Sequence, residues 1–170
     1  MVKTVLFVSL LFLNACNSEK EAGTQADYLR WVGDIPYEPD FDNVDFELCH
    51  GESNVMQYFN FTQGLQYEGE KIAIVKEFLR KYKPVETKDS GLIRVRFIVN
   101  CKGETDRFRL LAMDDNYVEK KFDPEITSQL MRITKQLNGW KVLPNSAEAQ
   151  DYYQYLIFKI EEGNILDILP

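Results

Sequence analysis

The sequence predicts an α+β fold in which two helices pack on a small antiparallel sheet of three or more strands. Side chains alternate with period two from Gly91 to Asn100 and from Asp106 to Leu111, on either side of a turn at Lys102-Gly103. Two other stretches place apolar residues at helical spacing, and an aromatic, β-branched stretch runs from Tyr153 to Ile160. We expect residues 68–170 to form one compact domain of this class.

The composition favours a folded protein and argues against a nucleic-acid partner. The chain has 170 residues, of which 45% are hydrophobic and 13% aromatic, which is enough for a packed core in a single domain. Its formal net charge is -7, because 27 acidic residues outnumber 20 basic ones. Nonspecific binding to nucleic acid depends on a basic surface that releases counterions from the phosphates. We therefore expect no nucleic-acid partner.

The first predicted helix runs from Gly69 to Tyr82. Its apolar residues at helical spacing share one face, and two neighbours widen that face: Ile72, Val75, Leu79 and Tyr82, with Ile74 and Phe78. We expect this face to be buried against the sheet. Lys81 and Lys83 suit the negative end of the helix dipole, and Pro84 ends the helix.

The second predicted helix runs from Pro124 to Asn138. Asp123 suits the N-cap position, and a proline is favoured in the first turn. The core stripe of this helix consists of Ile126, Leu130, Ile133 and Leu137. We expect Gly139 to end the helix and Trp140 to cover the end of the core. After the strand at Tyr153, residues 165–169 are expected to add a short terminal strand.

Four arginines are predicted to project from one face of the first two strands. The apolar residues of the first strand alternate with Arg94 and Arg96, and those of the second strand alternate with Arg107 and Arg109. Two interpretations follow. The arginines can form a receptor for an acidic or carboxylate-bearing partner. Alternatively, they line a solvated sheet face and pair with carboxylates of the same hairpin or of another strand.

The first sixteen residues have the organisation of an export signal. Lys3 is a short basic start, the segment from Val5 to Leu13 is apolar, and Asn14-Ala15-Cys16 follows. The apolar segment is too short for a membrane-spanning helix, which needs roughly twenty residues. The end of the segment resembles the lipobox of bacterial lipoproteins. That resemblance implies cleavage after Ala15 and acylation of Cys16, for example with palmitate, whereas an ordinary signal peptide with an unrelated cysteine is the alternative.

The same resemblance implies that the mature protein is anchored to a membrane through lipid on Cys16. Residues 1–15 would be removed as the lipoprotein signal peptide. Residues 16–25 are polar and lack apolar periodicity, as expected for a tether between the lipid and the folded domain. Asn17, in place of an aspartate after the lipidated cysteine, favours the outer membrane with the domain facing the periplasm. Exposure at the cell surface remains an alternative.

Residues 26–67 are rich in aromatic and acidic residues, and they are too aromatic for a linker. We expect this N-terminal extension to pack on the core and to add an edge strand, with a second candidate strand from Val55 to Phe61. The segment Asp40–Asp45 is either a calcium loop or a solvated acidic surface, and it lacks the turn glycine and closing glutamate of an EF-hand. His50 is the only histidine, and no nucleophile accompanies it, so we expect no catalytic residues and no cofactor or metal.

Cys49 and Cys101 remain once Cys16 is assigned to the lipid. Exported compartments are oxidising, so we expect a disulfide that ties the extension to the first hairpin. Two alternatives stay open, namely two buried free thiols and a metal site that includes His50. A metal site with three ligands would lack the fourth ligand that structural zinc normally has.

Taken in order, the C-terminal elements resemble the C-terminal domain of the TonB family. The family's pattern is a glycine and an alternating strand that ends in a glycine turn, then an amphipathic helix that closes on a tryptophan, and finally an apolar strand. The matching residues are Gly91, Phe97, Val99, Gly103, Leu130, Trp140, Phe158 and Ile160. The resemblance covers roughly the last half of the chain. It implies a TonB C-terminal-like sheet whose edge accepts a peptide strand.

Together, the two resemblances imply an envelope lipoprotein of a Bacteroidetes type. We expect a nonenzymatic protein that binds a peptide segment or envelope protein along an exposed strand or the arginine face, with a link to TonB-dependent transport. TonB proteins also carry a membrane helix and a proline-rich spacer, whereas this chain has 6 prolines, so force transmission is not implied. The alternative function is a structural or assembly lipoprotein without a peptide-binding groove.

Overall fold

The computed structural model describes residues 33–57, 65–144 and 148–169, and all of them belong to one compact unit. The predicted signal peptide and tether, with the lipidation site Cys16, lie outside the described residues. None of the helices in the described ranges has the length and apolarity that crossing a bilayer requires.

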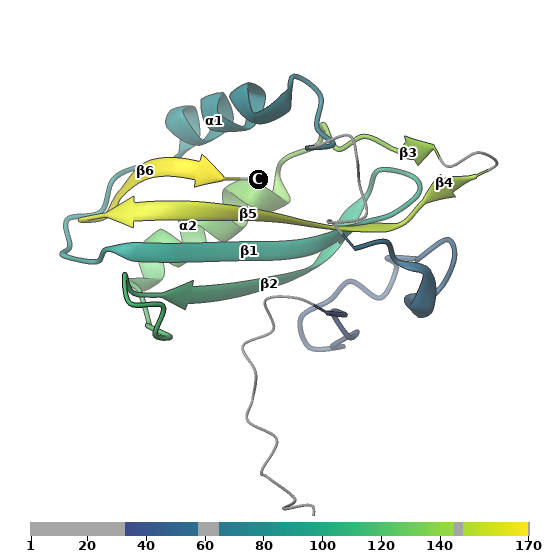
Figure 1. Cartoon of the computed structure of the whole chain (residues 1–170), viewed down its shortest axis with the longest axis horizontal. Coiled ribbons are helices and arrows are strands. Elements are labelled where there is room, and N and C mark those ends of the chain that lie inside the picture. Colours follow the sequence, from purple (N-terminus) through teal and green to yellow (C-terminus); the bar gives the residue numbers. More distant parts are fainter. Residues whose placement is uncertain (1–32, 58–64, 145–147, 170) are drawn as a thin grey trace, which may run out of the picture. The chain divides into compact units, whose positions relative to one another are not determined.

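Four antiparallel strands form the main sheet in the order β2-β1-β5-β6, and two α-helices accompany it (Figure 1). This arrangement confirms the predicted α+β class. A second, two-stranded sheet pairs β3 with β4. The elements in chain order are the short 3-10 helix η1 (Glu52–Asn54), α1 (Glu70–Lys81), β1 (Gly91–Val99), β2 (Thr105–Met113), α2 (Pro124–Lys135), β3 (Leu143–Pro144), β4 (Ala149–Gln150), β5 (Tyr152–Glu161) and β6 (Asn164–Leu169).

The core lies between the helices and the inner face of the sheet. Strand β1 is central, and Val95 is paired with β2 on one side and with β5 on the other. Phe97, on the same face of β1 as Val95, stacks on Phe108 at 5.0 Å between ring centroids. Trp140 contacts Phe97 at the same centroid distance and is buried, so it covers the end of the core as predicted. Phe78 of α1 packs on the ring of Phe158 of β5.

Both helices differ from the prediction in one respect. In α1 the buried residues are Ile74 and Phe78, whereas Ile72 and Leu79 are 68% and 76% exposed. The predicted central stripe is therefore wrong, because the buried face is centred on the two residues that were expected only to widen it. Helix α2 begins as predicted, with the Asp123 side chain accepting the Glu125 N–H at 2.8 Å. It ends at Lys135 and does not reach the predicted end at Asn138.

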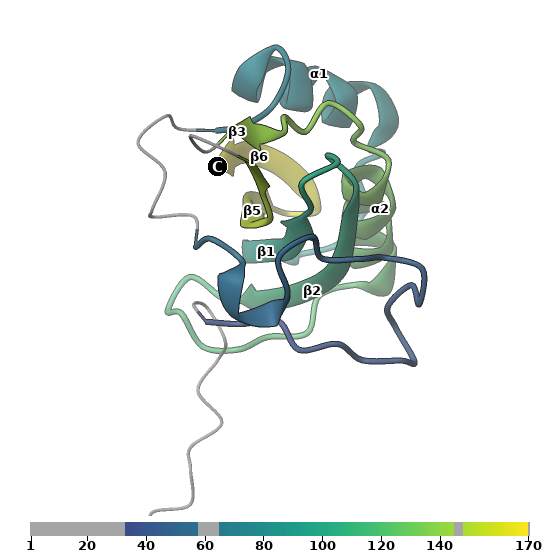
Figure 2. The same ribbon diagram turned by 90° about the vertical axis from the view of Figure 1, so that its right-hand side faces the viewer.

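Residues 33–57 lie beside β2 on the side of the molecule away from α1, as Figure 2 shows with the sheet viewed nearly end-on. A small apolar cluster fixes them there: Ile35 and Val55 pack with Ile98 of β1 and Tyr153 of β5. The edge strand predicted in the extension does not form within residues 33–57. Their one ladder contact is an isolated bridge from Met56 to Tyr152. The rest of the candidate strand from Val55 to Phe61 lies outside the described residues.

The turn between β5 and β6 depends on Gly163. Its φ is +74°, and an added Cβ would overlap the carbonyl oxygen of Val85. The Gly163 carbonyl accepts hydrogen bonds from the Val85 N–H at 3.2 Å and the Tyr82 hydroxyl at 2.8 Å. The Gly163 N–H donates to the carbonyl of Asp89 at 3.1 Å. This turn therefore holds the connection between α1 and β1 against the sheet.

We predict that Gly163→Ala lowers the free energy of unfolding by about 3 kcal/mol, because it adds both a strained φ and a steric overlap. Gly51→Ala is the matched control, because Gly51 has a similar φ of +76° but no atom within 4 Å of its added Cβ. That control should cost only about 1 kcal/mol. Urea unfolding followed by circular dichroism measures both values. Equal losses in the two variants would show that the contact with Val85 is not a constraint.

Candidate functional site

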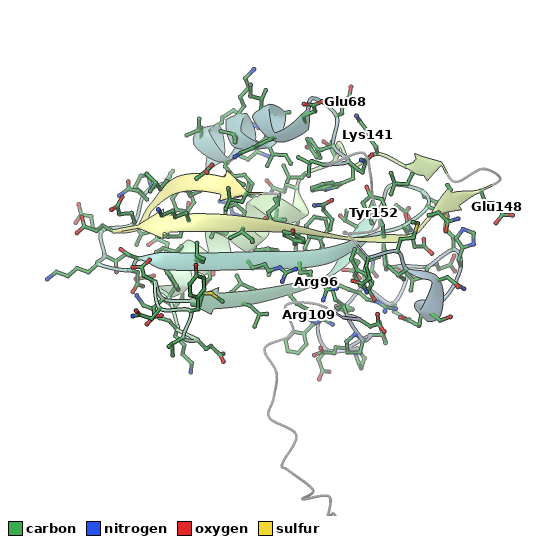
Figure 3. The ribbon with its side chains drawn as sticks, viewed as in Figure 1. Glu68, Arg96, Arg109, Lys141, Glu148 and Tyr152 are labelled. Carbon is green, nitrogen blue, oxygen red and sulfur yellow. A yellow bond between two sulfur atoms is a disulfide. The ribbon has the colours of Figure 1, made fainter. Side chains whose placement is uncertain are left out.

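Residues 33–57 bury most of the arginine face. Arg94, Arg96 and Arg107 are buried, and Arg109 is half-buried. Figure 3 shows Arg96 and Arg109 on the side of the sheet where the extension lies. The prediction that these arginines form an exposed receptor face is therefore wrong for the three buried ones. The competing interpretation, a solvated face paired with carboxylates of the hairpin or of another strand, is also wrong in part: Arg107 and Arg109 do pair with carboxylates, but the face is covered.

The carboxylates that pair with Arg107 and Arg109 come from the extension. Arg107 donates two hydrogen bonds of 2.6 Å to the carboxylate of Glu52. Arg109 donates two of 2.7 Å to Asp42, which has only 1% of its side chain exposed, and a third of 3.1 Å to Glu38. Bidentate pairs of this kind are strong and geometrically specific. We call this set of contacts the arginine layer.

A β-bulge in β2 lies within the arginine layer. The register between β1 and β2 shifts between Arg96 and Ile98, and Arg107 has a left-handed φ of 56°. A bulge adds an unpaired residue to one strand and redirects its side chain. Arg107 and Arg109 keep the ordinary alternation of a strand, so both side chains reach residues 33–57 while Phe108 between them packs in the core.

Two aromatic rings support the remaining arginines. The Arg94 guanidinium lies 4.4 Å from the ring centroid of Tyr155, and that of Arg96 lies 4.6 Å from Tyr153. Arg96 also donates to the carbonyl oxygen of Gly33. Burial lowers the pKa of Arg94 to about 10, with a further contribution from the charge of Arg96. Both arginines still carry their charge at neutral pH.

Cys49 and Cys101 form a disulfide, with their Cα atoms 6.0 Å apart. The buried carboxylate of Asp151 accepts the backbone N–H of Cys101 through one oxygen and that of His50 through the other, each at 2.9 Å. The His50 ring contacts the carbonyl of Ala149 at 2.6 Å. The extension is therefore joined to the end of β1 by a covalent bond and by hydrogen bonds around it.

The candidate metal ligands have structural partners. Within the described ranges, Cys49, Cys101 and Asp151 are the group whose ligand atoms lie close enough to hold a cation. The two sulfurs are bonded to each other, and the Asp151 oxygens accept backbone N–H groups. Of the segment predicted as a possible calcium loop, Asp42 is committed to Arg109. These contacts favour a structural role for all four residues.

The best candidate for a binding surface is a groove between α1 and the edge strand β6. Its volume is about 310 Å³, and α1 and its C-terminal connection contribute Val75, Phe78, Leu79, Tyr82 and Pro84. Residues 164–168 of β6 form its other wall. We call it the α1/β6 groove. In the part of the chain that the structure describes, β6 pairs only with β5, so its outer edge has no neighbouring strand, although the Ile168 N–H donates to the Asp167 carboxylate at 2.7 Å.

Apolar side chains flank the α1/β6 groove. Leu79 is 76% exposed and Leu166 is 55% exposed, and Ile72 lies on the same flank of α1 one heptad before Leu79. The charges beside the groove are mutually neutralised, because Lys71 contacts Asp167 at 3.1 Å. The hydrogen bond from Lys71 holds the pKa of Asp167 below its ordinary value. Burial raises the pKa of Tyr82 to about 12, so its hydroxyl remains a donor to Gly163.

The sequence contained part of the signal for this groove. Ile72 and Leu79 were identified as apolar helix residues and assigned to the core, and residues 165–169 were predicted to form the last strand. What was missing was that β6 is an edge strand, because strand order depends on which strands pair and not on local periodicity. The four predicted arginines lie outside the groove lining.

We predict that replacing both cysteines (Cys49→Ser with Cys101→Ser) lowers the free energy of unfolding by about 4 kcal/mol. The disulfide closes a loop with a sequence separation of 52, and closing such a loop constrains the unfolded chain by about that amount. Urea titrations with and without a reductant measure the effect. The reduced protein should match the double variant, and a reductant without effect on the unreplaced chain would contradict the prediction.

We predict that acid weakens the arginine layer. Burial alone would raise the pKa of Asp42, but hydrogen bonds and charge interactions with Arg109, with further help from Arg107, hold it below its ordinary value of 3.8. Hydrogen bonds from Arg107 likewise lower the pKa of Glu52 from 4.5. Groups with lowered pKa values contribute stability that is fully present above the unfolded pKa and is lost as the pH falls through the folded pKa.

The melting temperature should therefore change little between pH 7 and pH 5 through these groups, and fall below about pH 4. Asp42→Asn should cost about 3 kcal/mol at neutral pH and reduce the acid-dependent loss, because it leaves Arg109 without its bidentate partner. Asp115→Asn, at an exposed site, is the control. Thermal melts across this pH range provide the measurement. An unchanged acid dependence in Asp42→Asn would contradict the prediction.

No protein-family model, curated protein or solved structure matches this chain. The resemblance of residues 91–160 to TonB C-terminal domains therefore stays a prediction, and the arguments for function come from the geometry above.

Proposed function

We propose that this protein is a nonenzymatic lipoprotein of the bacterial cell envelope, anchored through Cys16, that binds an extended segment of another envelope protein along the free edge of β6. The observation that carries the proposal is the α1/β6 groove, where exposed apolar side chains adjoin an unpaired strand edge. A peptide strand that adds to a sheet gains affinity from main-chain hydrogen bonds and specificity from side-chain pockets. The groove offers both of these elements.

The exposed residues support a binding role for this edge. Natural proteins blunt edge strands with charges, bulges and short length, and β6 does carry Asp167 and a register shift opposite Lys159 and Ile160. Those features do not account for Leu79 and Leu166, which place apolar surface beside the edge. A contiguous exposed apolar surface of this kind is typical of a docking site. We include a link to TonB-dependent transport in the proposal because of the resemblance to TonB domains.

A second candidate function is a structural or assembly lipoprotein without a peptide-binding groove. The observation that favours it is the arginine layer, because residues 33–57 cover the face of the sheet whose arginines would otherwise be able to bind an acidic partner. The two functions differ at β6. A purely structural protein has no need for an apolar groove beside that edge.

The test uses the full-length protein in nonionic detergent and a peptide selected against it from a random displayed library. Two versions of that peptide carry backbone N-methyl groups on alternate residues. In one version the odd-numbered residues are methylated, and in the other the even-numbered residues. A strand that pairs with β6 turns the N–H groups of only one set toward it, so one version should lose binding and the other should retain it. Fluorescence anisotropy measures both affinities. Equal binding by the two versions would exclude strand addition.

Two protein variants test whether the peptide binds at the α1/β6 groove. Leu79→Asp should weaken binding about tenfold or more, because it removes an apolar contact and puts a charge beside the groove. Val44→Asp is the matched control, since Val44 is 79% exposed, close to the value for Leu79, but belongs to the extension. Equal affinities of the two variants would favour the structural alternative.

A further inference from the structure

A second groove lies at the other edge of the sheet, between α2 and the edge strand β2. Its volume is about 890 Å³, larger than that of the α1/β6 groove. Its lining includes an apolar floor formed by Leu110 of β2, Phe122 of the following connection and Met131 of α2. Phe122 is buried, and the other two are half-buried. We call it the α2/β2 groove.

The rim of the α2/β2 groove is cationic, in contrast to the chain as a whole. Its lining includes one acidic side chain, Glu119, and four basic ones: Lys120, Lys121, Arg132 and Lys135. The formal net charge of the whole chain is -7. The groove thus concentrates positive charge on a protein that otherwise repels anions.

Three of the four cations are available to a ligand. Lys120 is already paired with Asp89 at 2.9 Å. The Lys135 ammonium lies 5.3 Å from the ring centroid of Phe108, which places it over the side of β2 that faces α2. In the described ranges no carboxylate lies within ion-pair distance of Lys121, Arg132 or Lys135, and all three side chains are exposed. A carboxylate that approaches the groove therefore displaces no carboxylate partner of these three residues.

Backbone hydrogen bonds along the edge of β2 begin a strand pairing that a bound peptide can extend. The Lys120 N–H donates to the Ala112 carbonyl at 3.0 Å, and the Asp114 N–H donates to the Val118 carbonyl at 2.9 Å. Residues 118–120 thus occupy the start of the position that a further strand would take. Backbone groups in an antiparallel pair alternate between neighbours with period two. Because Ala112 turns its carbonyl outward, Leu110 presents its backbone groups to the same side.

We propose that the α2/β2 groove binds an extended polypeptide segment that is rich in carboxylates and also carries apolar side chains. Its backbone pairs with β2 at Leu110, its apolar side chains cover Phe122 and Met131, and its carboxylates meet the exposed cations of the rim. A strand edge distinguishes a polypeptide from an anionic membrane surface, because only a polypeptide can supply the matching N–H and C=O groups. Charge complementarity then selects an acidic segment over a neutral one.

The test uses full-length protein in nonionic detergent and three labelled, acetylated and amidated peptides. In the first, pairs of glutamates alternate with pairs of valines, so that each face of the extended peptide carries both residue types. The second has glutamine in place of glutamate, and the third has lysine. The acidic peptide should bind on the order of tenfold more tightly than the neutral one at low ionic strength. The lysine peptide should bind most weakly, and raising salt from about 50 to about 300 mM should reduce the preference.

The location is tested with two triple variants of equal charge change. The groove variant combines Lys121→Gln, Arg132→Gln and Lys135→Gln, and the control combines Lys88→Gln, Lys102→Gln and Lys141→Gln at exposed sites outside the groove lining. The groove variant should lose on the order of tenfold in affinity for the acidic peptide, and the control should lose much less. Thermal melts verify that both variants fold.

Equal affinities for the acidic and neutral peptides would overturn the proposal, and so would equal losses of affinity for the acidic peptide in the two triple variants. Binding to vesicles of an anionic phospholipid, with no binding to the acidic peptide, would also overturn it. The outcome is separate from that of the α1/β6 groove, because the two grooves lie at opposite edges of the sheet. A groove variant that still binds the library-selected peptide but not the acidic one would assign one ligand to each edge.

Discussion

The burial of Arg94, Arg96 and Arg107, with Arg109 half-buried beside them, is the constraint on which the rest of this structure depends. Neighbouring guanidinium groups repel one another and lose hydration when they are buried, so they need anions, aromatic rings or carbonyl groups close by. Asp42 and Glu52 supply the anions for Arg109 and Arg107, and both belong to the extension. Residues 33–57 are therefore an integral layer of the fold. Loss of this layer would leave buried charge without partners and expose the small apolar cluster around Tyr153.

This requirement determines which surfaces remain for binding. The helices pack on one face of the sheet and residues 33–57 contact the arginines of the other, and β2 and β6 are the two edge strands. The edges differ in chemistry. The α1/β6 groove has exposed leucines and a neutralised pair of charges, whereas the α2/β2 groove has exposed cations beside an apolar floor. A small domain can in this way present two surfaces that favour different segments.

Local signals explain why much of the fold was predictable from the sequence. The alternation in β1 and β2, the Asp123 cap and the aromatic content of β5 place these elements close to their observed bounds. Features that depend on distant segments were not predictable. The arginine partners are one example, because Asp42 and Arg109 are 67 positions apart in the sequence. The exposed flank of α1 is another, because periodicity identifies an apolar face but not how far a neighbouring element covers it. The disulfide was predicted from the number of cysteines and the expected compartment.

The position of the disulfide also determines how the domain responds to a mechanical load. A pull on the chain at Gly33 acts first on the noncovalent contacts of the residues before Cys49. The covalent bond then stops further peeling and transfers the force to Cys101, at the end of the central strand. Antiparallel neighbours bond to β1 on both sides, so the load is shared across the sheet and does not fall on one edge. The contacts of Arg109 with Glu38 and Asp42 can thus yield under tension, whereas the Arg107–Glu52 pair lies beyond the disulfide and is shielded from the load.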